Sequence, residues 1–77
     1  MTTIIRMTSA SSDERIIKSN EEFAALHGEV VNCNPYSIGE VFIGIVDVKV
    51  EDESLVNQIM SGLGTAQECY SVVKWCS

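Results

Sequence analysis

The sequence EVFIGIVDVKV, residues Glu40–Val50, is the longest β-branched and aromatic run in this chain of 77 residues, and it predicts a central β-strand. Successive side chains of a strand point to opposite faces, so one face of this segment is apolar along its whole length. That face carries Phe42, Val46, Val48 and Val50. The other face is apolar at Val41, Ile43 and Ile45, before Asp47 and Lys49 interrupt it. We therefore expect the first face to be buried throughout and the second over half of its length.

Upstream of this strand the sequence predicts another strand and a helix. The β-prone residues Thr2–Thr8 form the first expected strand, and the small polar run Ser9–Asp13 a loop. The segment Glu14–Lys18 is interpreted as a possible extra strand that forms a hairpin with the first. A capping box at Ser19–Glu22 then predicts the start of a two-turn helix, which ends at Gly28 in a left-handed conformation.

Downstream, a second helix and a final strand are expected. Glu29–Cys33 is a short strand, and Asn34–Ser37 has the residues of a β-turn that leads back into the central strand. The acids Glu51–Glu53 stand where a helix N-terminus offers free amides, with Asp52 as the expected cap. Apolar residues then recur at helical spacing: Leu55, Val56, Ile59, Met60 and Leu63. Glu68–Cys76 is the predicted last strand.

These elements predict a small α+β domain over residues 1–77 with the order β-α-β-β-α-β, the ferredoxin-like or split βαβ arrangement. We expect a two-layer sandwich in which two helices cover one face of an antiparallel-rich sheet of four strands, or five if Glu14–Lys18 is a strand. The predicted core combines apolar residues of both helices and of the central strand: Phe23, Phe42, Val46, Val48, Leu55 and Ile59.

Composition limits the kinds of protein this chain can be. A domain this small leaves little room for a deep enzyme pocket. Eleven acidic and five basic residues give a formal charge of −6, which disfavours direct contact with nucleic acid or an anionic membrane. The N-terminus lacks the pattern of a signal peptide, and no apolar run approaches the roughly 18 residues of a membrane span. The three cysteines are an odd number without framework spacing, so we expect reduced thiols and a cytoplasmic location.

Several residues carry reactive or metal-binding groups without forming a recognisable motif. His27, Cys33, Cys69 and Cys76 provide four possible zinc ligands, but they lack the close pairs that structural zinc sites use. Cys33 with His27 would make a nucleophile and base, with no third group specified. The sequence Gly62–Thr65 suggests a phosphate loop, yet it follows a helix and is better explained as a helix end. We expect no catalytic residue, metal or cofactor.

Two surfaces are candidates for binding a partner. The first is acidic and includes Glu21, Glu22, Glu51, Asp52 and Glu53. Charges of one sign steer association with a basic surface, although helix capping also explains acids at these places.

The second candidate is the uncovered face of the sheet. It includes Val41, Ile43, Ile45 and Trp75, with Val73 beside them and Tyr36 in a neighbouring loop. This apolar face is expected to meet water unless the N-terminal segment or the residues 32–39 cover it. A second copy of the chain or another protein would bind there.

Size and charge lead to a first hypothesis of a non-enzymatic protein-binding inhibitor. It would act on a nucleic-acid-handling protein with a basic surface, in the manner of phage or mobile-element anti-restriction and anti-CRISPR proteins or DNA mimics. The alternative is a homodimeric regulatory or small-ligand-binding domain that uses the open sheet face. A third hypothesis is a small thiol or metal enzyme.

Overall fold

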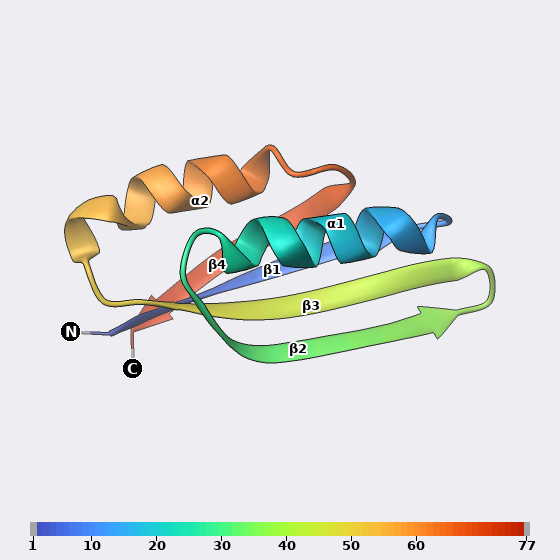
Figure 1. The fold of residues 1–77 in the computed structure, drawn as a ribbon, viewed down its shortest axis with the longest axis horizontal. Helices are drawn as coiled ribbons and strands as arrows, with labels where there is room; N and C mark the ends of the chain where they lie inside the picture. The colour runs from blue at the N-terminus through green and yellow to red at the C-terminus, as the bar shows by residue number, and fades with distance from the viewer. Residues whose placement is uncertain (1, 77) are drawn as a thin grey trace.

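The segment expected to be the central strand is β3 (Val41–Val50), and it lies between two other strands in a sheet of order β2-β3-β1-β4. The computed structural model describes residues 2–76. Its other elements are β1 (Thr3–Ser11), α1 (Glu14–Ala25), β2 (Glu29–Ile38), the 3₁₀ turn η1 (Glu53–Leu55), α2 (Val56–Gly64) and β4 (Cys69–Cys76). All neighbouring strands are antiparallel. Both helices lie on the same face of the sheet (Figure 1), so the ferredoxin-like arrangement is confirmed.

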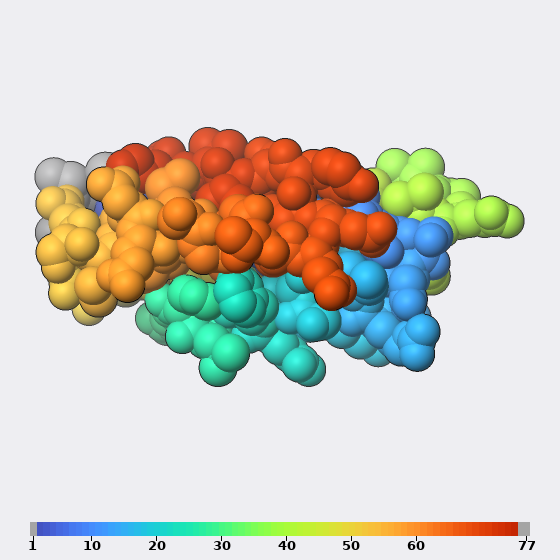
Figure 2. All heavy atoms as spheres, turned by 90° about the horizontal axis from the view of Figure 1, so that it is seen from above, coloured from blue at the N-terminus to red at the C-terminus, as the bar shows by residue number. Residues whose placement is uncertain are grey.

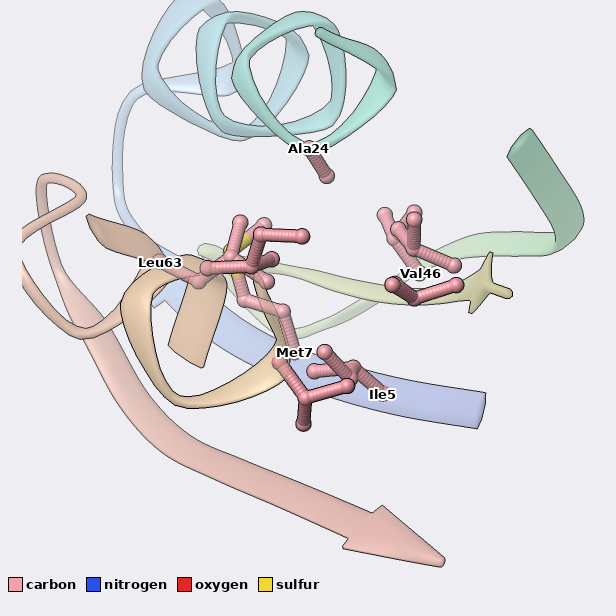
Figure 3. Close-up of a cluster of buried hydrophobic side chains, with 9 residues drawn as sticks. Ile5, Met7, Ala24, Val46 and Leu63 are labelled. Carbon is pink, nitrogen blue, oxygen red and sulfur yellow. The ribbon is translucent and has the colours of Figure 1, made fainter. Parts of the chain in front are cut away.

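The core lies between this face and the helices because β1 and β3 present matched apolar residues there. Along β1, buried residues alternate with partly exposed ones, as expected for a strand covered on one face. The register pairs Ile5 with Val48 and Met7 with Val46, and all four are fully buried. Ala24 of α1 lies above the cluster and Leu63 of α2 lies at its side (Figure 3). Its remaining members are Val50, Val56 and Ile59.

Helix α1 begins earlier than its capping box predicted. The side chain of Asp13 accepts a hydrogen bond from the Arg15 amide at 3.0 Å and caps the helix, which then includes both Glu14–Lys18 and Ser19–Glu22. The interpretation of Glu14–Lys18 as an extra strand is therefore wrong, and the described residues form a sheet of four strands.

Strand β2 is longer than expected, because the predicted turn at Asn34–Ser37 is part of it. Pro35 is tolerated since β2 is an edge strand, where a missing N–H costs least. The chain turns instead at Gly39, whose φ of 60° suits a residue without a Cβ atom. The resulting β2–β3 hairpin extends beyond the helices at one end of the molecule (Figure 2, yellow-green).

Gly28 has a different role from the left-handed helix end that was predicted. Its φ is not positive, and a Cβ atom there would lie 2.5 Å from Cγ1 of Val48 and 2.8 Å from the Lys49 carbonyl oxygen. A glycine at this position therefore lets the start of β2 pass close to β3.

The predicted core is partly confirmed. Val46, Val48 and Ile59 are buried, and Phe23 and Phe42 are partly buried. Leu55 is wrongly placed, because it belongs to η1 and is 44% exposed. Within residues 2–76, no helix is long and apolar enough to span a membrane.

Candidate functional site

A cavity of about 320 Å³ opens between α1 and the β2–β3 hairpin, and we call it the α1–β2 cavity. Residues spaced three or four apart share one side of a helix, which is why four residues of α1 reach it together. They are Glu14, Ile17, Lys18 and Glu21. The strands contribute Pro35, Tyr36, Ser37, Phe42 and Ile43. The cavity therefore combines apolar walls with a few charged groups, as small-molecule sites do.

The charges of the α1–β2 cavity leave one carboxylate without a counter-charge. Lys18 Nζ lies 3.9 Å from Glu14 Oε1, so these two groups largely neutralise each other. Glu21 has no ion-pair partner among the described residues, and its Oε1 atom is buried without a hydrogen bond to any of them. A shielded, unpaired carboxylate oxygen is costly, and a donor bound nearby would relieve that cost.

A second unpaired oxygen lies beside the cavity, around Gly44. A Cβ atom at Gly44 would lie 2.7 Å from Cγ2 of Ile17, 3.4 Å from Ser9 Oγ and 3.6 Å from Glu21 Oε1. The Ser9 hydroxyl is buried and makes no hydrogen bond within residues 2–76. Glycine at this position of β3 thus allows α1 to pack closely on the sheet and brings two polar groups near each other.

Cys33 lies on β2 near the same carboxylate. Burial, followed by the negative charge of Glu21, raises the pKa of the Cys33 thiol. Reactive cysteines have a lowered pKa, because the thiolate is the nucleophile. The surroundings of Cys33 therefore oppose the hypothesis of a thiol nucleophile.

The opposite face of the sheet, which we call the open face, carries a polar band across β2, β3 and β1. Arg6 of β1 donates to both carboxylate oxygens of Asp47 on β3, at 2.8 and 3.0 Å. Asn32 of β2 donates to Asp47 Oδ2 at 3.3 Å. On the other side, the Arg6 guanidinium lies 5.2 Å from the ring centre of Trp75 on β4, a cation–π contact. The hydrogen bonds from Arg6, ahead of that from Asn32, hold the pKa of Asp47 below its usual range.

Apolar residues surround this polar band on the open face. Strand registers and the alternation of burial place there Ile4, Tyr36, Ile38, Val41, Ile43, Ile45, Val73 and Trp75. The segments that were expected to cover the face are themselves strands β1 and β2. The prediction of an uncovered apolar face that includes Val41, Ile43 and Ile45 is confirmed as a structural feature, and its role in binding stays a prediction.

The acidic residues predicted to bind a partner lie on separate elements. Asp52 caps η1 through the Ser54 amide at 3.0 Å, as predicted, and Glu51 lies 3.5 Å from Lys49 Nζ. Glu53 belongs to η1. Of the pair on α1, Glu21 lines the cavity whereas Glu22 is exposed. Helix capping accounts for the position of Asp52, and an ion pair accounts for that of Glu51. Neither residue therefore needs a partner protein to explain its place.

The possible zinc ligands are dispersed. His27 Nδ1 lies 2.8 Å from the Phe23 carbonyl oxygen, and its ring lies against α2 at Gly62. Cys69 is partly buried at the edge of the core, and the side chain of Cys76 lies outside the described part of the chain. Across the described residues, no three His, Cys, Asp or Glu side chains are close enough together to hold a metal ion. Thr65 Oγ1 donates to the Gly62 carbonyl at 2.7 Å, so the sequence Gly62–Thr65 ends α2 as expected.

The chain matches no known protein-family model, and no curated protein is similar to it in sequence. Its fold does resemble solved structures. The ACT domain from GTP pyrophosphokinase of Chlorobium tepidum superposes with a TM-score of 0.65 at 10% identity, and the match covers 97% of each chain. The C-terminal domain of the MgtC protein from Mycobacterium tuberculosis gives a TM-score of 0.58 at 7% identity, covering 99% of this chain and 86% of that domain. At such identities the likeness concerns the fold.

These similarities correct the leading functional hypothesis. The fold neighbours include ACT domains and no phage or mobile-element inhibitor is among those described above, so the hypothesis of an anti-restriction or anti-CRISPR inhibitor is wrong. That hypothesis rested only on an analogy of size and charge.

Proposed function

We propose that this chain is a non-catalytic regulatory domain that binds a small ligand in the α1–β2 cavity. The ligand combines a cationic amino or guanidino group with an apolar body. The observation that carries the proposal is the Glu21 carboxylate, which lines the cavity with one oxygen buried and unpaired among the described residues.

The lining determines the class of ligand. With Lys18 beside Glu14, the remaining charge of the lining is that of Glu21, which favours a cation. Ile17, Pro35 and Phe42 offer apolar contact to the rest of the ligand. The volume of about 320 Å³ is at the lower end of ligand sites, which suits a small metabolite rather than a dinucleotide.

Two further observations support a regulatory rather than a catalytic role. The fold neighbours include ACT domains, which are regulatory domains for small ligands. The thiol of Cys33, which lies near Glu21, has a raised pKa and is poorly suited to nucleophilic catalysis. The cytoplasmic location expected from the cysteines stays a prediction.

A thermal-shift experiment tests the proposal with 2-phenylethylamine as the cationic probe and 3-phenylpropionate as its anionic counterpart. The amine is expected to raise the unfolding temperature in a concentration-dependent way, because a ligand that binds only the folded state stabilises it. The acid is expected to have no such effect.

A matched pair of variants locates the interaction. Glu21→Gln removes the charge in the cavity, whereas Glu22→Gln removes the same charge from the exposed neighbouring position. Stabilisation by the amine should be lost in the first variant and kept in the second. Equal stabilisation by amine and acid, or an unchanged response of Glu21→Gln, would contradict the proposal.

A further inference from the structure

We infer that the open face is an interface between two copies of this chain, packed face to face about a two-fold axis. The two open faces would come together while the α1–β2 cavity stays on the outer, helix-covered side of each copy. The two surfaces lie mainly on opposite sides of the sheet and share only Tyr36 and Ile43 among the residues named for each, so the dimer can be tested apart from the proposed ligand by variants at other positions.

The extent of the open face suits a stable dimer. Its strands are eight to ten residues long. At a rise of about 3.3 Å per residue and a strand spacing of about 4.8 Å, the sheet measures roughly 30 by 19 Å, or about 570 Å² in plane. Side chains roughen this plane, so the accessible surface approaches the ~800 Å² per partner of a standard interface.

Large apolar side chains are exposed across this face. Ile38 is 64% exposed, Val73 51% and Tyr36 43%. A contiguous apolar patch of several hundred Å² is unusual on a monomer, whereas a central apolar area with aromatic residues is typical of interfaces. In a face-to-face pair such side chains form a second core about 10 Å thick, as between the sheets of a sandwich.

The polar band makes the face suitable for burial against its own copy. Arg6 and Asp47 neutralise each other within one chain, so no net charge of this pair has to be desolvated. The guanidinium has five N–H donors, and two of them are used in hydrogen bonds to described residues. The remaining donors need acceptors across the interface, which a purely apolar partner would not provide.

A second copy provides those acceptors by symmetry. Arg6 and Asp47 are direct neighbours across β1 and β3, so a two-fold axis between them places Arg6 of each copy above Asp47 of the other. Asn34 and Thr8 share the open face according to the strand registers and bring further side-chain oxygens. The charge pattern is therefore complementary to itself.

The acidic residues also favour this orientation. Asp13 caps α1, Glu21 and Glu22 belong to α1, and Asp52 caps η1. Helix α1 lies over the face opposite to the interface, so much of the formal charge of −6 is kept away from the contact. A strongly basic partner on the open face would lack these carboxylates as counterparts.

Analytical ultracentrifugation of the full chain tests the inference. The expected result is a species of twice the 8.4 kDa chain mass at micromolar concentration. Ile45→Glu and Val73→Glu each add an unpaired charge to the open face outside the cavity lining and should give monomers, since that charge would have to be desolvated on association. Leu26→Glu is the matched control, because Leu26 is 83% exposed at the end of α1 and should leave the dimer intact.

Circular dichroism establishes whether each variant is folded. The two open-face variants lie on different strands, so the test can still be made if one of them does not fold. A wild-type chain that stays monomeric at several hundred micromolar overturns the inference. So does a dimer that persists in both folded open-face variants, since that dimer would use another surface, such as the free edge of β2. Dissociation by Leu26→Glu would place the interface on the helices instead.

Discussion

Arg6 and Asp47 would each be an isolated charge on a mostly apolar sheet face if the other were missing. Their bidentate pairing, with Asn32 as a further donor, is possible because β1 and β3 place them directly opposite each other. Asp47 is only 6% exposed even though it lies on the open face. The pair therefore ties the two central strands together on the side that the helices do not cover.

This pairing predicts a specific dependence of stability on pH. Hydrogen bonds from Arg6 lower the pKa of Asp47 in the folded state, so the group stabilises the fold above its unfolded pKa of about 3.9. That contribution is lost as the pH falls through the lower, folded pKa. Urea unfolding should show that Asp47→Asn is less stable than the wild type at pH 7 and loses less stability on going to pH 2.

Asp52→Asn is the control for this measurement. Asparagine caps a helix about as well as aspartate. Hydrogen bonds from Ser54 lower the pKa of Asp52 too, but this carboxylate is exposed to solvent, so its substitution should change the pH profile less than Asp47→Asn does. Parallel profiles for the wild type and Asp47→Asn would show that the Arg6–Asp47 pair does not contribute to the pH dependence.

Replacing glycine by alanine is expected to have opposite effects on stability at two positions. Gly28→Ala places a methyl group 2.5 Å from a side-chain atom of Val48 and 2.8 Å from the Lys49 carbonyl oxygen. It should destabilise the fold by about 1–3 kcal/mol, the usual cost of overpacking. Gly64→Ala meets nothing within 4 Å at the end of α2 and should stabilise it by roughly 0.5–1 kcal/mol, because alanine loses less entropy in a helix. Thermal unfolding of both variants checks the contrast, and equal effects would contradict the close approach at Gly28.

Among the elements, α1 shows where local sequence patterns mislead. Two consecutive isoleucines favoured a strand at Glu14–Lys18, yet Asp13 caps a helix whose residues Ile17, Asn20 and Ala24 are buried at helical spacing. Asn20 donates to the Gln67 carbonyl, a contact with the loop after α2 that sequence spacing does not reveal. The tertiary contacts of a short segment thus outweighed its β propensity.

The β2–β3 hairpin shows a related effect. The proline in Asn34–Ser37 predicted a turn, but proline is also compatible with an edge strand. Whether β2 stands at an edge of the sheet is set by the topology, which the local sequence does not show. Within β3, by contrast, burial of the helix-covered face was predicted correctly at Val46, Val48 and Val50, because strand periodicity needs no distant partner. The expectation for the other face was wrong, because Asp47 is buried there and Val41 is exposed.

Helix α2 allows a test of which of its residues support the core. Ile59 is buried and Leu55, just before the helix, is largely exposed. Ile59→Ala should therefore cost about 2–5 kcal/mol in the free energy of unfolding, whereas Leu55→Ala should stay within roughly 1 kcal/mol. Chemical denaturation measures both, and similar losses would show that η1 packs more tightly than the structure indicates.

At the level of the whole molecule, the sheet separates two surfaces with different chemistry. The helix-covered side contains the α1–β2 cavity with its unpaired carboxylate, and the open side contains the polar band and its apolar surroundings. Two-layer folds of this kind leave one sheet face free, which makes it available for association.

The sequence predicted the fold class and the apolar part of the open face, because both follow from the periodicity of single strands. It did not predict the cavity or the Arg6–Asp47 pair, because these depend on which residues of distant strands and helices become neighbours. A signal for the pair existed in the sequence, since Arg6 is the one charged residue of Thr3–Ser11 and Asp47 is the one acidic residue of Val41–Val50. Only the strand register showed that they meet.

Chemical-shift mapping by NMR locates the proposed ligand site on the molecule. During titration with 2-phenylethylamine, the amide signals of Glu14–Glu21 in α1 and of Pro35–Phe42 around the hairpin should change, except at proline, because these segments line the cavity. The signals of Arg6 and Val73 on the open face should stay unchanged. Changes confined to the open face, or no saturable change at Glu21, would contradict a small-ligand site in the α1–β2 cavity.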